Sequence, residues 1–190
     1  MYILGDIGNS ESKVFLVNSK NKVIKNMNFP SKKINNQLLK SKFRYLVKDF
    51  NKIEKILFCS VVPKSFRLIK NFLSKNTKIR CYEVKDLKLK SLINVKVNFN
   101  QVGPDRLTNA ISLANNHKNF VILDFGTATT FDVLMKNSYS GGIIAPGVRL
   151  SLSTLADKAT LIPKINLKKI KKIIGRDTIS AVRSGFFWGY

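Results

Sequence analysis

A chain of 190 residues fits one large domain or two small ones, and its 44% hydrophobic content is normal for a globular protein with a packed core. No apolar run approaches the roughly 20 residues that span a bilayer, and Asp6 interrupts the first apolar stretch, which argues against a signal peptide. A membrane protein is therefore not expected, and the cytoplasm is the expected compartment.

The net charge of +23 raises the possibility of nucleic-acid binding. However, the basic residues are 27 lysines and only 7 arginines, whereas specific phosphate and base contacts favour arginine. Residues 103–162, which hold most of the candidate motifs, carry five basic and four acidic residues. A solvated lysine-rich surface is the preferred interpretation, and nucleic acid is not the expected partner.

The cysteines and the histidine do not indicate a metal site. Cys59 and Cys81 lie in apolar runs and are expected to be small buried hydrophobic residues. His117 is expected at a solvated helix end. Because no His/Cys cluster exists in the sequence, zinc chemistry is not expected.

The first half of the chain predicts three strands in meander order, then alternating helices and strands. The expected elements are strands at 2–6, 12–17 and 22–28, a helix at 35–51, a strand at 55–61, a helix at 63–73 and a strand at 78–84. This order predicts a mixed sheet with helices on its faces.

The second half repeats part of this order after an irregular connector at 87–102. The expected elements are a helix from 104 to about 116, strands at 119–124, 129–136 and 141–145 with a turn at 137–140, a helix at 148–156, a loop or short helix at 161–172 and a last helix at 178–188. The predicted domains are residues 1–102 and residues 103–190, the second being a partial copy of the first.

A strand that ends in Asp-x-Gly occurs twice, 118 residues apart, as Asp6-Ile7-Gly8 and Asp124-Phe125-Gly126. In each copy the glycine permits a tight turn, and small polar residues and a second strand follow. Internal duplication of this kind indicates that the chain is built from two units of similar architecture. Two such turns facing each other could hold a polyphosphate and its metal.

Four aspartates, Asp6, Asp105, Asp124 and Asp132, are placed at strand ends, turns or a helix start. Converging carboxylates repel each other unless a cation lies between them, and Mg²⁺ suits a few carboxylates with waters and phosphate oxygens. Any one of these residues could merely cap a turn or a helix. Four of them beside duplicated glycine turns favour a metal-assisted site.

Both turns also carry groups that can bind phosphate. Backbone N–H groups and short polar side chains can form anion-binding concavities, here at Gly8, Asn9 and Ser10 and at Thr127, Thr129 and Thr130. Lys13 could direct a compact charge at phosphates, although ordinary hairpin solvation explains it equally well. A Walker-type G-x-x-x-x-G-K sequence is absent, so a kinase with these turns would not be of the P-loop kind.

The sequence Gly103-Pro104-Asp105-Arg106 pairs an acid with a guanidinium. Asp105 could accept the proton of a hydroxyl that attacks phosphorus, and Arg106 could bind a carboxylate or a phosphate. A helix cap beside a surface arginine is the structural alternative.

Taken together, these motifs resemble those of type III pantothenate kinase, a family of the actin-like, sugar kinase and Hsp70 ATPase superfamily. The resemblance rests on five ordered motifs: Asp6–Lys13 for D-x-G-N-[TS]-x-x-K, Gly103–Arg106 for G-x-D-R, Asp124–Asp132 for D-x-G-T-A-T-T-x-D, Gly141–Gly147 for G-G-x-I-x-P-G, and Gly175–Thr178 for G-x-[DN]-T. It implies an α/β fold of two ribonuclease H-like units, each a mixed sheet flanked by helices.

The resemblance also implies the activity, which is ATP-dependent phosphorylation of pantothenate to 4'-phosphopantothenate, the first step of coenzyme A biosynthesis. It further implies Mg²⁺, a monovalent cation (K⁺ or NH₄⁺) and a homodimer. Asp105 would be the catalytic base, and Asp124 would ligate the monovalent cation. ATP would bind Asp6, Ile7, Gly8, Asn9, Ser10, Glu11, Ser12, Lys13 and Thr127. Pantothenate would bind Phe99, Gly103, Pro104, Asp105, Arg106 and Thr178.

The sequence departs from the family pattern in two places. Relatives often have a tyrosine shortly before G-x-D-R, where Phe99 is the nearest aromatic residue here. Family members also continue past the last helix into further strands and a glycine-rich turn near the adenine, so the second unit is expected to be shortened at its C-terminus. Two alternatives to the kinase stay open at this point: a metal-dependent ribonuclease H-like nuclease, and a non-catalytic ATP-binding or regulatory relative.

Overall fold

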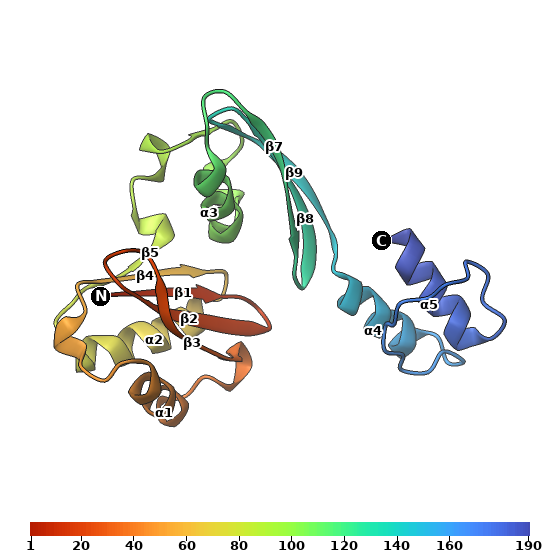
Figure 1. The fold of residues 1–190 in the computed structure, drawn as a ribbon, viewed down its shortest axis with the longest axis horizontal. Coiled ribbons are helices and arrows are strands. Elements are labelled where there is room, and N and C mark those ends of the chain that lie inside the picture. The colour runs from red at the N-terminus through yellow and green to blue at the C-terminus, as the bar shows by residue number, and fades with distance from the viewer. The chain divides into compact units, whose positions relative to one another are not determined.

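The computed structural model describes residues 1–190 and shows an α/β chain with two compact units (Figure 1). Unit 1 comprises Met1–Phe120 and Val133–Gly141, and unit 2 comprises Val121–Asp132 and Gly142–Tyr190. Residues 103–120 thus group with unit 1, whereas the predicted second domain begins at Gly103. The predicted domains follow the repeat in the sequence, whereas the two compact units are defined by how densely their residues contact one another. The predicted division therefore stays a prediction.

A five-stranded mixed sheet forms the centre of unit 1, in the strand order β3-β2-β1-β4-β5. Strand β1 pairs antiparallel with β2 and parallel with β4, which in turn pairs parallel with β5. This confirms the predicted series of three meander strands followed by helix, strand, helix and strand. The elements are β1 (Tyr2–Ile7), β2 (Glu11–Val17), β3 (Val23–Pro30), α1 (Asn36–Leu46), β4 (Lys55–Ser60), α2 (Pro63–Asn76) and β5 (Cys81–Glu83).

The alternation of side chains along β1 separates the core from the candidate site. Ile3 and Ile7 are buried in the hydrophobic cluster, which also includes Phe43 of α1 and Phe66 of α2. Because successive strand residues point to opposite faces, the intervening Asp6 lies on the other face of the sheet, where it is exposed. The apolar pattern that builds the core therefore also decides where this carboxylate lies.

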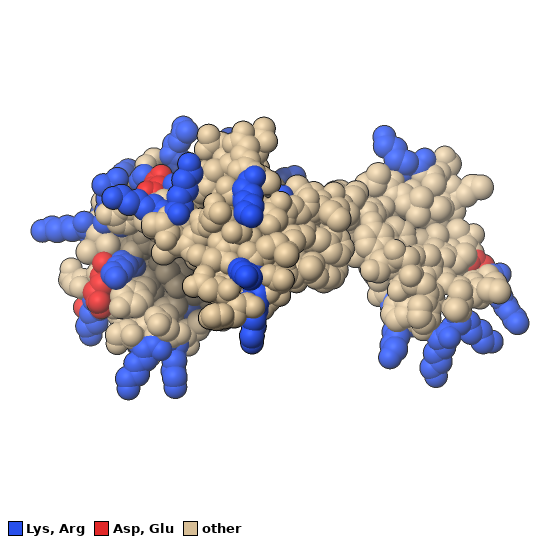
Figure 2. Space-filling view, turned by 90° about the horizontal axis from the view of Figure 1, so that it is seen from above, with Lys and Arg blue, Asp and Glu red and all other residues tan.

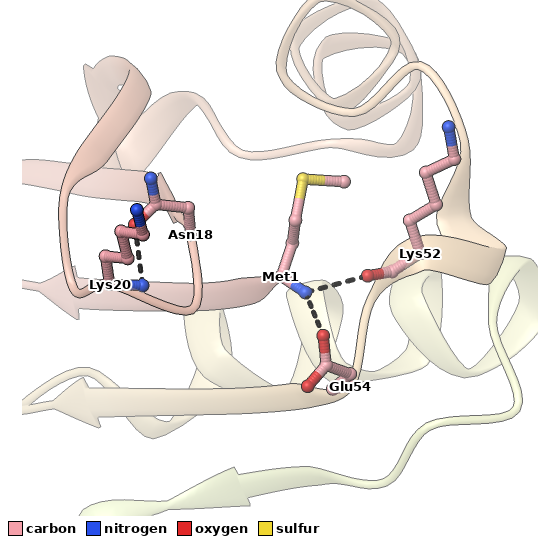
Figure 3. Close-up of polar contacts among 5 residues, drawn as sticks. All are labelled: Met1, Asn18, Lys20, Lys52 and Glu54. Atoms are coloured by element: carbon pink, nitrogen blue, oxygen red, sulfur yellow. Dashed lines mark hydrogen bonds and ion pairs between the residues drawn. The ribbon is translucent and has the colours of Figure 1, made fainter.

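The start of β1 is tied to the segment before β4 (Figure 3). The amino group of Met1 donates a hydrogen bond to the carbonyl oxygen of Lys52 at 2.9 Å and contacts the carboxylate of Glu54, whose backbone N–H donates to the Met1 carbonyl at 2.8 Å. At the β2–β3 turn, Asn18 Oδ1 accepts the backbone N–H of Lys20 at 3.0 Å. The contacts of Met1 support the register in which Asp6 of β1 lies beside Cys59 of β4.

A second, four-stranded sheet has the order β6-β9-β8-β7, which confirms the second meander. Strand β6 pairs parallel with β9. The remaining elements are β6 (Asn94–Val95), α3 (Pro104–Leu113), β7 (Asn119–Phe125), β8 (Ala128–Met135), β9 (Ser138–Pro146), α4 (Val148–Lys158) and α5 (Thr178–Gly189), with short 3₁₀ helices at Ser31–Lys33, Phe50–Lys52, Val84–Asp86, Leu89–Ser91 and Phe99–Gln101. No helix combines the length and the apolar character needed to cross a membrane.

Several predicted element boundaries were wrong, and a local feature of the chain explains three of them. Helix α1 ends at Leu46 rather than near residue 51, since the Asp49 side chain accepts the N–H of Asn51 at 2.9 Å and starts a separate turn. Strand β5 begins only at Cys81, after Thr77 Oγ1 has accepted the N–H of Ile79 at 3.1 Å. Strand β9 begins at Ser138, because Lys136 takes the turn position with φ of 54°.

The positive charge is spread over the face of the molecule that Figure 2 shows. In Figure 2 the Lys and Arg side chains are scattered over the visible face and do not form one continuous patch. Both cysteines are free and buried, as predicted.

Candidate active site

The hairpin between β1 and β2 forms the first Asp-x-Gly turn. The Gly8 N–H donates to the Glu11 carbonyl oxygen at 3.0 Å, which closes the turn. Asp6 lies directly opposite Lys13 in the antiparallel register, so the two side chains are on the same face of the sheet. Both residues are exposed. The turn therefore places the side chains of Asp6 and Lys13 on one exposed face of the sheet, where the Lys13 ammonium lies 4.0 Å from Glu11 Oε2.

The other predicted ATP ligands of this turn differ in exposure. Asn9, Ser10 and Glu11 are exposed, whereas Ile7 belongs to the hydrophobic core. Ser12 is fully buried, and its hydroxyl lies 2.8 Å from Ser31 Oγ. Ile7 and Ser12 therefore support the turn from beneath, and the exposed members present polar groups above it.

The second Asp-x-Gly turn lies in unit 2, where the Gly126 N–H donates to the Ala128 carbonyl at 2.9 Å. Of the three threonines at this turn, only Thr127 is exposed. Thr129 is buried and its hydroxyl has no hydrogen-bond partner, while Thr130 Oγ1 donates to Asp132 Oδ2 at 3.3 Å. Because Asp132 is completely buried, it is not a surface ligand, and Thr127 is the one of the three threonines whose side chain faces solvent.

Gly147 connects this turn to the start of α4. Its N–H donates to the Thr127 carbonyl at 2.9 Å. A Cβ atom at Gly147 would lie 2.3 Å from the Gly126 carbonyl oxygen and 2.6 Å from that of Thr127. The Pro146-Gly147 pair therefore needs glycine, because the backbone passes directly against the turn.

Asp105 lies in the first turn of α3, which Pro104 begins. The carboxylate is half-buried, and its Oδ1 accepts the Arg106 N–H at 2.8 Å. A Cβ atom at Gly103 would lie 2.3 Å from this Oδ1. Gly103 therefore makes room for the carboxylate of Asp105, which explains the spacing of this motif.

We expect Gly103→Ala to lower kcat/KM by about 100-fold, because a displacement of a reacting group by about 1 Å can cost that much. The added methyl group would push the Asp105 carboxylate out of its position, while the φ of −58° at Gly103 is acceptable for alanine. Steady-state kinetics would measure the effect. Gly185→Ala is the matched control, because its Cβ would meet no atom within 4 Å. Equal activity of both variants would contradict the role of Gly103.

Asp6 and Asp105 both lie close to Cys59 at the carboxyl end of β4. Thr108 Oγ1 of α3 donates to the Pro104 carbonyl at 2.7 Å and lies 3.8 Å from Cys59 Sγ. Burial raises the pKa of the Cys59 thiol to about 12; the Thr108 hydrogen bond opposes this shift, and the negative charges of Asp6 and Asp105 add to it. The fold thus brings two of the predicted site carboxylates towards one thiol at the ends of parallel strands, where α/β proteins commonly bind ligands.

The predicted pantothenate residues Arg106 and Phe99 each contact a side chain that the motifs do not include. The Arg106 guanidinium lies 6.0 Å from the ring centroid of buried Tyr139. The ammonium groups of Lys85 and Lys90 lie 5.7 Å and 5.3 Å from the ring centroid of Phe99. Both aromatic rings therefore have a cation over them, an arrangement that stabilises positive charge near the site.

Thr178 is the first residue of α5, in unit 2, and a capping box fixes it there. The Asp177 carboxylate accepts the Ser180 N–H at 2.9 Å. Hydrogen bonds from the backbone N–H and hydroxyl of Ser180 lower the pKa of the Asp177 carboxyl, so it stays ionised as a cap. Gly175 allows close approach to α5, since its Cβ would lie 2.2 Å from the Ala181 nitrogen. The G-x-D-T motif is thus a helix start that presents Thr178 to solvent.

The predicted site aspartates could bind a metal ion only together with oxygen atoms from a bound nucleotide and from water. Asp124 is exposed near the end of β7, two residues before Gly126. No group of three or more His, Cys, Asp or Glu side chains is arranged to hold a metal ion. Mg²⁺ is usually held by one or two carboxylates, waters and substrate phosphates rather than by a cage of protein groups. The residues present therefore fit a cation that enters with a nucleotide.

Sequence reasoning missed several residues that support the site. Ser31, Thr108 and Tyr139 lie outside the five motifs, although Thr108 is in α3 and Tyr139 is in β9, and their contacts form only in the folded chain. For Ser31 and Thr108, no pattern in spacing or hydropathy distinguishes them from surface residues. Tyr139 falls where the sequence predicts a turn, so its burial could not be expected.

The two mixed sheets with their flanking helices define an α/β fold, which a putative 2-dehydro-3-deoxygalactonokinase from Sinorhizobium meliloti shares with a TM-score of 0.51 at 10% identity, over 85% of this chain and 58% of its own. Among solved structures, a Baf family protein from Campylobacter jejuni matches 98% of this chain and 74% of its own with a TM-score of 0.53 at 21% identity. The family model for type III pantothenate kinase matches residues 2–190. The chain belongs to the type III pantothenate kinase family.

Curated relatives of that name cover the whole chain. The protein from Pelagibacter ubique (strain HTCC1062) is 60% identical over 190 residues, which is 100% of this chain and 77% of the relative. The protein from Sulfurihydrogenibium sp. (strain YO3AOP1) is 34% identical over 197 residues, with 100% and 78% coverage. The family's activity is the phosphorylation of pantothenate in coenzyme A biosynthesis, and ATP use follows from its being a kinase family.

Proposed function

We propose that this chain transfers the γ-phosphoryl group of ATP to pantothenate, with Asp105 as the base that accepts the proton of the attacking hydroxyl. The observation that carries this proposal is the half-buried carboxylate of Asp105, held over Gly103 at the start of α3 and close to the same thiol as Asp6. Phosphoryl transfer depends mainly on positioning and electrostatic stabilisation, and a positioned base contributes about 10²–10⁴-fold.

In this proposal the phosphates of ATP contact the first turn, from Asp6 to Lys13, and Thr127. The exposure of Asn9, Ser10 and Thr127 and the pairing of Asp6 with Lys13 support it. Pantothenate would contact Phe99, Gly103, Pro104, Asp105, Arg106 and Thr178. The guanidinium of Arg106 suits the carboxylate of pantothenate, because arginine binds carboxylates in a bidentate manner.

We further propose that Mg²⁺ accompanies ATP and that Asp124 binds a monovalent cation, K⁺ or NH₄⁺. Asp6 and Asp124 supply the hard oxygen donors that such ions prefer, and a bound cation would offset negative charge on the phosphates. The working form would be a homodimer in the cytoplasm. A reducing compartment fits the two free cysteines, Cys59 and Cys81.

Turnover should increase when K⁺ or NH₄⁺ is added and should not increase with Na⁺ at the same ionic strength. The expected reason is that K⁺ and NH₄⁺ hold their hydration water less tightly than Na⁺, so they give it up more readily to bind the carboxylate of Asp124. Initial rates in the three chloride salts, at saturating Mg²⁺ and ATP, would measure the effect. Equal rates in all three salts would reject the Asp124 assignment.

The experiment that tests the proposed function compares two substrates. The chain is expected to release ADP from ATP only when pantothenate is present, and to leave a radiolabelled RNA–DNA hybrid intact in Mg²⁺. Cleavage of the hybrid without pantothenate-dependent ADP release would favour the nuclease. ATP binding without turnover would identify a non-catalytic relative. Family membership and the scattered surface charge favour the kinase.

A further inference from the structure

The first Asp-x-Gly turn is hydrogen-bonded to a buried serine that belongs to none of the motifs. Ser31 lies in the short 3₁₀ helix after β3 and is only 4% exposed. Its hydroxyl donates to the Gly8 carbonyl oxygen at 2.6 Å, and its backbone N–H donates to the Ser10 carbonyl oxygen at 3.1 Å. One residue thus holds both ends of the three-residue turn between β1 and β2.

Two further buried serines fix Ser31 itself. Ser12 is completely buried, with its hydroxyl 2.8 Å from that of Ser31, and Ser65 Oγ in the first turn of α2 donates to the Ser31 carbonyl at 3.4 Å. The Ser31 hydroxyl has one proton, which it donates to Gly8. The hydrogen bond between the two hydroxyls therefore runs from Ser12 to Ser31, and the chain Ser12, Ser31, Gly8 has one direction.

The hydrogen bond from Ser31 to the Gly8 carbonyl oxygen fixes the orientation of the Gly8–Asn9 peptide group. The peptide bond between Gly8 and Asn9 is planar and trans, so its C=O and N–H point in opposite directions. Because Ser31 holds the Gly8 carbonyl oxygen, the Asn9 N–H points away from Ser31. Backbone N–H groups oriented together at a turn form a concavity for anions.

We propose that Ser31 is a positioning residue for ATP, in that its hydroxyl holds the Gly8–Asn9 peptide so that the N–H of Asn9 faces the phosphates. This inference rests on the proposed function, since it takes the turn to be the phosphate site. Ser31 does not itself contact the nucleotide. Its removal leaves the Gly8 carbonyl without this donor and allows the peptide to rotate.

The test is Ser31→Ala in the full chain, with Ser41→Ala as control. Ser41 is an exposed residue of α1, in the same unit. We expect the Kd for Mg²⁺·ATP, measured by titration calorimetry, to rise on the order of tenfold in Ser31→Ala, because one oriented hydrogen bond is lost. The Kd for pantothenate should stay within twofold, and Ser41→Ala should match the wild type in both.

A second measurement does not depend on catalysis. Amide hydrogen exchange at Gly8, whose N–H closes the turn, should be about tenfold faster in Ser31→Ala without nucleotide, while core amides of β1 keep their protection. Unchanged ATP affinity with unchanged exchange at Gly8 would overturn the proposal, and so would equal losses of ATP and pantothenate affinity. If the wild-type chain bound ATP without transferring phosphate, the proposed function would be rejected. The ATP affinity and the Gly8 exchange rate of Ser31→Ala would still decide whether Ser31 positions the turn. A wild-type chain that does not bind ATP would overturn both.

Discussion

Asp105→Asn is expected to lower the rate of phosphoryl transfer by about 10²–10⁴-fold, with little change in folding. The amide preserves the shape of the carboxylate and can still accept the Arg106 N–H, which is 2.8 Å from Oδ1 in the wild type. However, it cannot accept the proton of the attacking hydroxyl. Single-turnover rates with saturating ATP and pantothenate would measure the loss.

The control for this prediction is Asp157→Asn, the same chemical change at an exposed residue of α4. Circular dichroism and ATP affinity should be the same for both variants and the wild type. A turnover rate for Asp105→Asn near that of the control would reject Asp105 as the base.

Gly147→Ala is expected to destabilise unit 2 by about 3 kcal/mol and to weaken ATP binding with it. The new Cβ would lie 2.3 Å and 2.6 Å from the carbonyl oxygens of Gly126 and Thr127. These are backbone atoms, so no side chain can move away to relieve the clash. The turn that carries Thr127 must shift instead.

Thermal unfolding followed by tryptophan fluorescence reports on this change, because Trp188 lies in α5 of the same unit. Gly189→Ala, whose Cβ would meet nothing within 4 Å, is the matched control. If both variants unfolded at the same temperature as the wild type, the close approach at Gly147 would not be structurally important.

The mixed sheet of unit 1 could be predicted from the sequence because its signals are local. Short apolar runs, residues 2–4 and 14–17, define β1 and β2, and Pro63 begins α2 where the spacing predicts a helix. Two of the predictions that failed, at the end of α1 and the start of β5, depended on single side chains that accept a neighbouring N–H, namely Asp49 and Thr77. Such hydrogen bonds compete with helix and strand formation. They involve single residues, so the periodicity of apolar residues does not indicate them.

The residues of the candidate site also differ in whether the sequence could predict them. Asp6, Gly8, Gly103 and Asp105 could be identified because each is part of a short motif with a chemical reason for its residues. The buried hydroxyl of Ser31 could not, because it reaches Gly8 across 23 positions of sequence. Contacts made by tertiary packing leave no periodic signal, and they decide how the motif residues are oriented.

The most direct test of the proposed kinase activity follows the phosphoryl group itself. The chain is incubated with Mg²⁺, K⁺, pantothenate and ATP labelled at the γ-phosphate, and the products are separated by mass. We predict that the label appears on the 4'-hydroxyl of pantothenate, with one ADP formed for each phosphopantothenate. Label found only in inorganic phosphate, or retained in ATP, would contradict it.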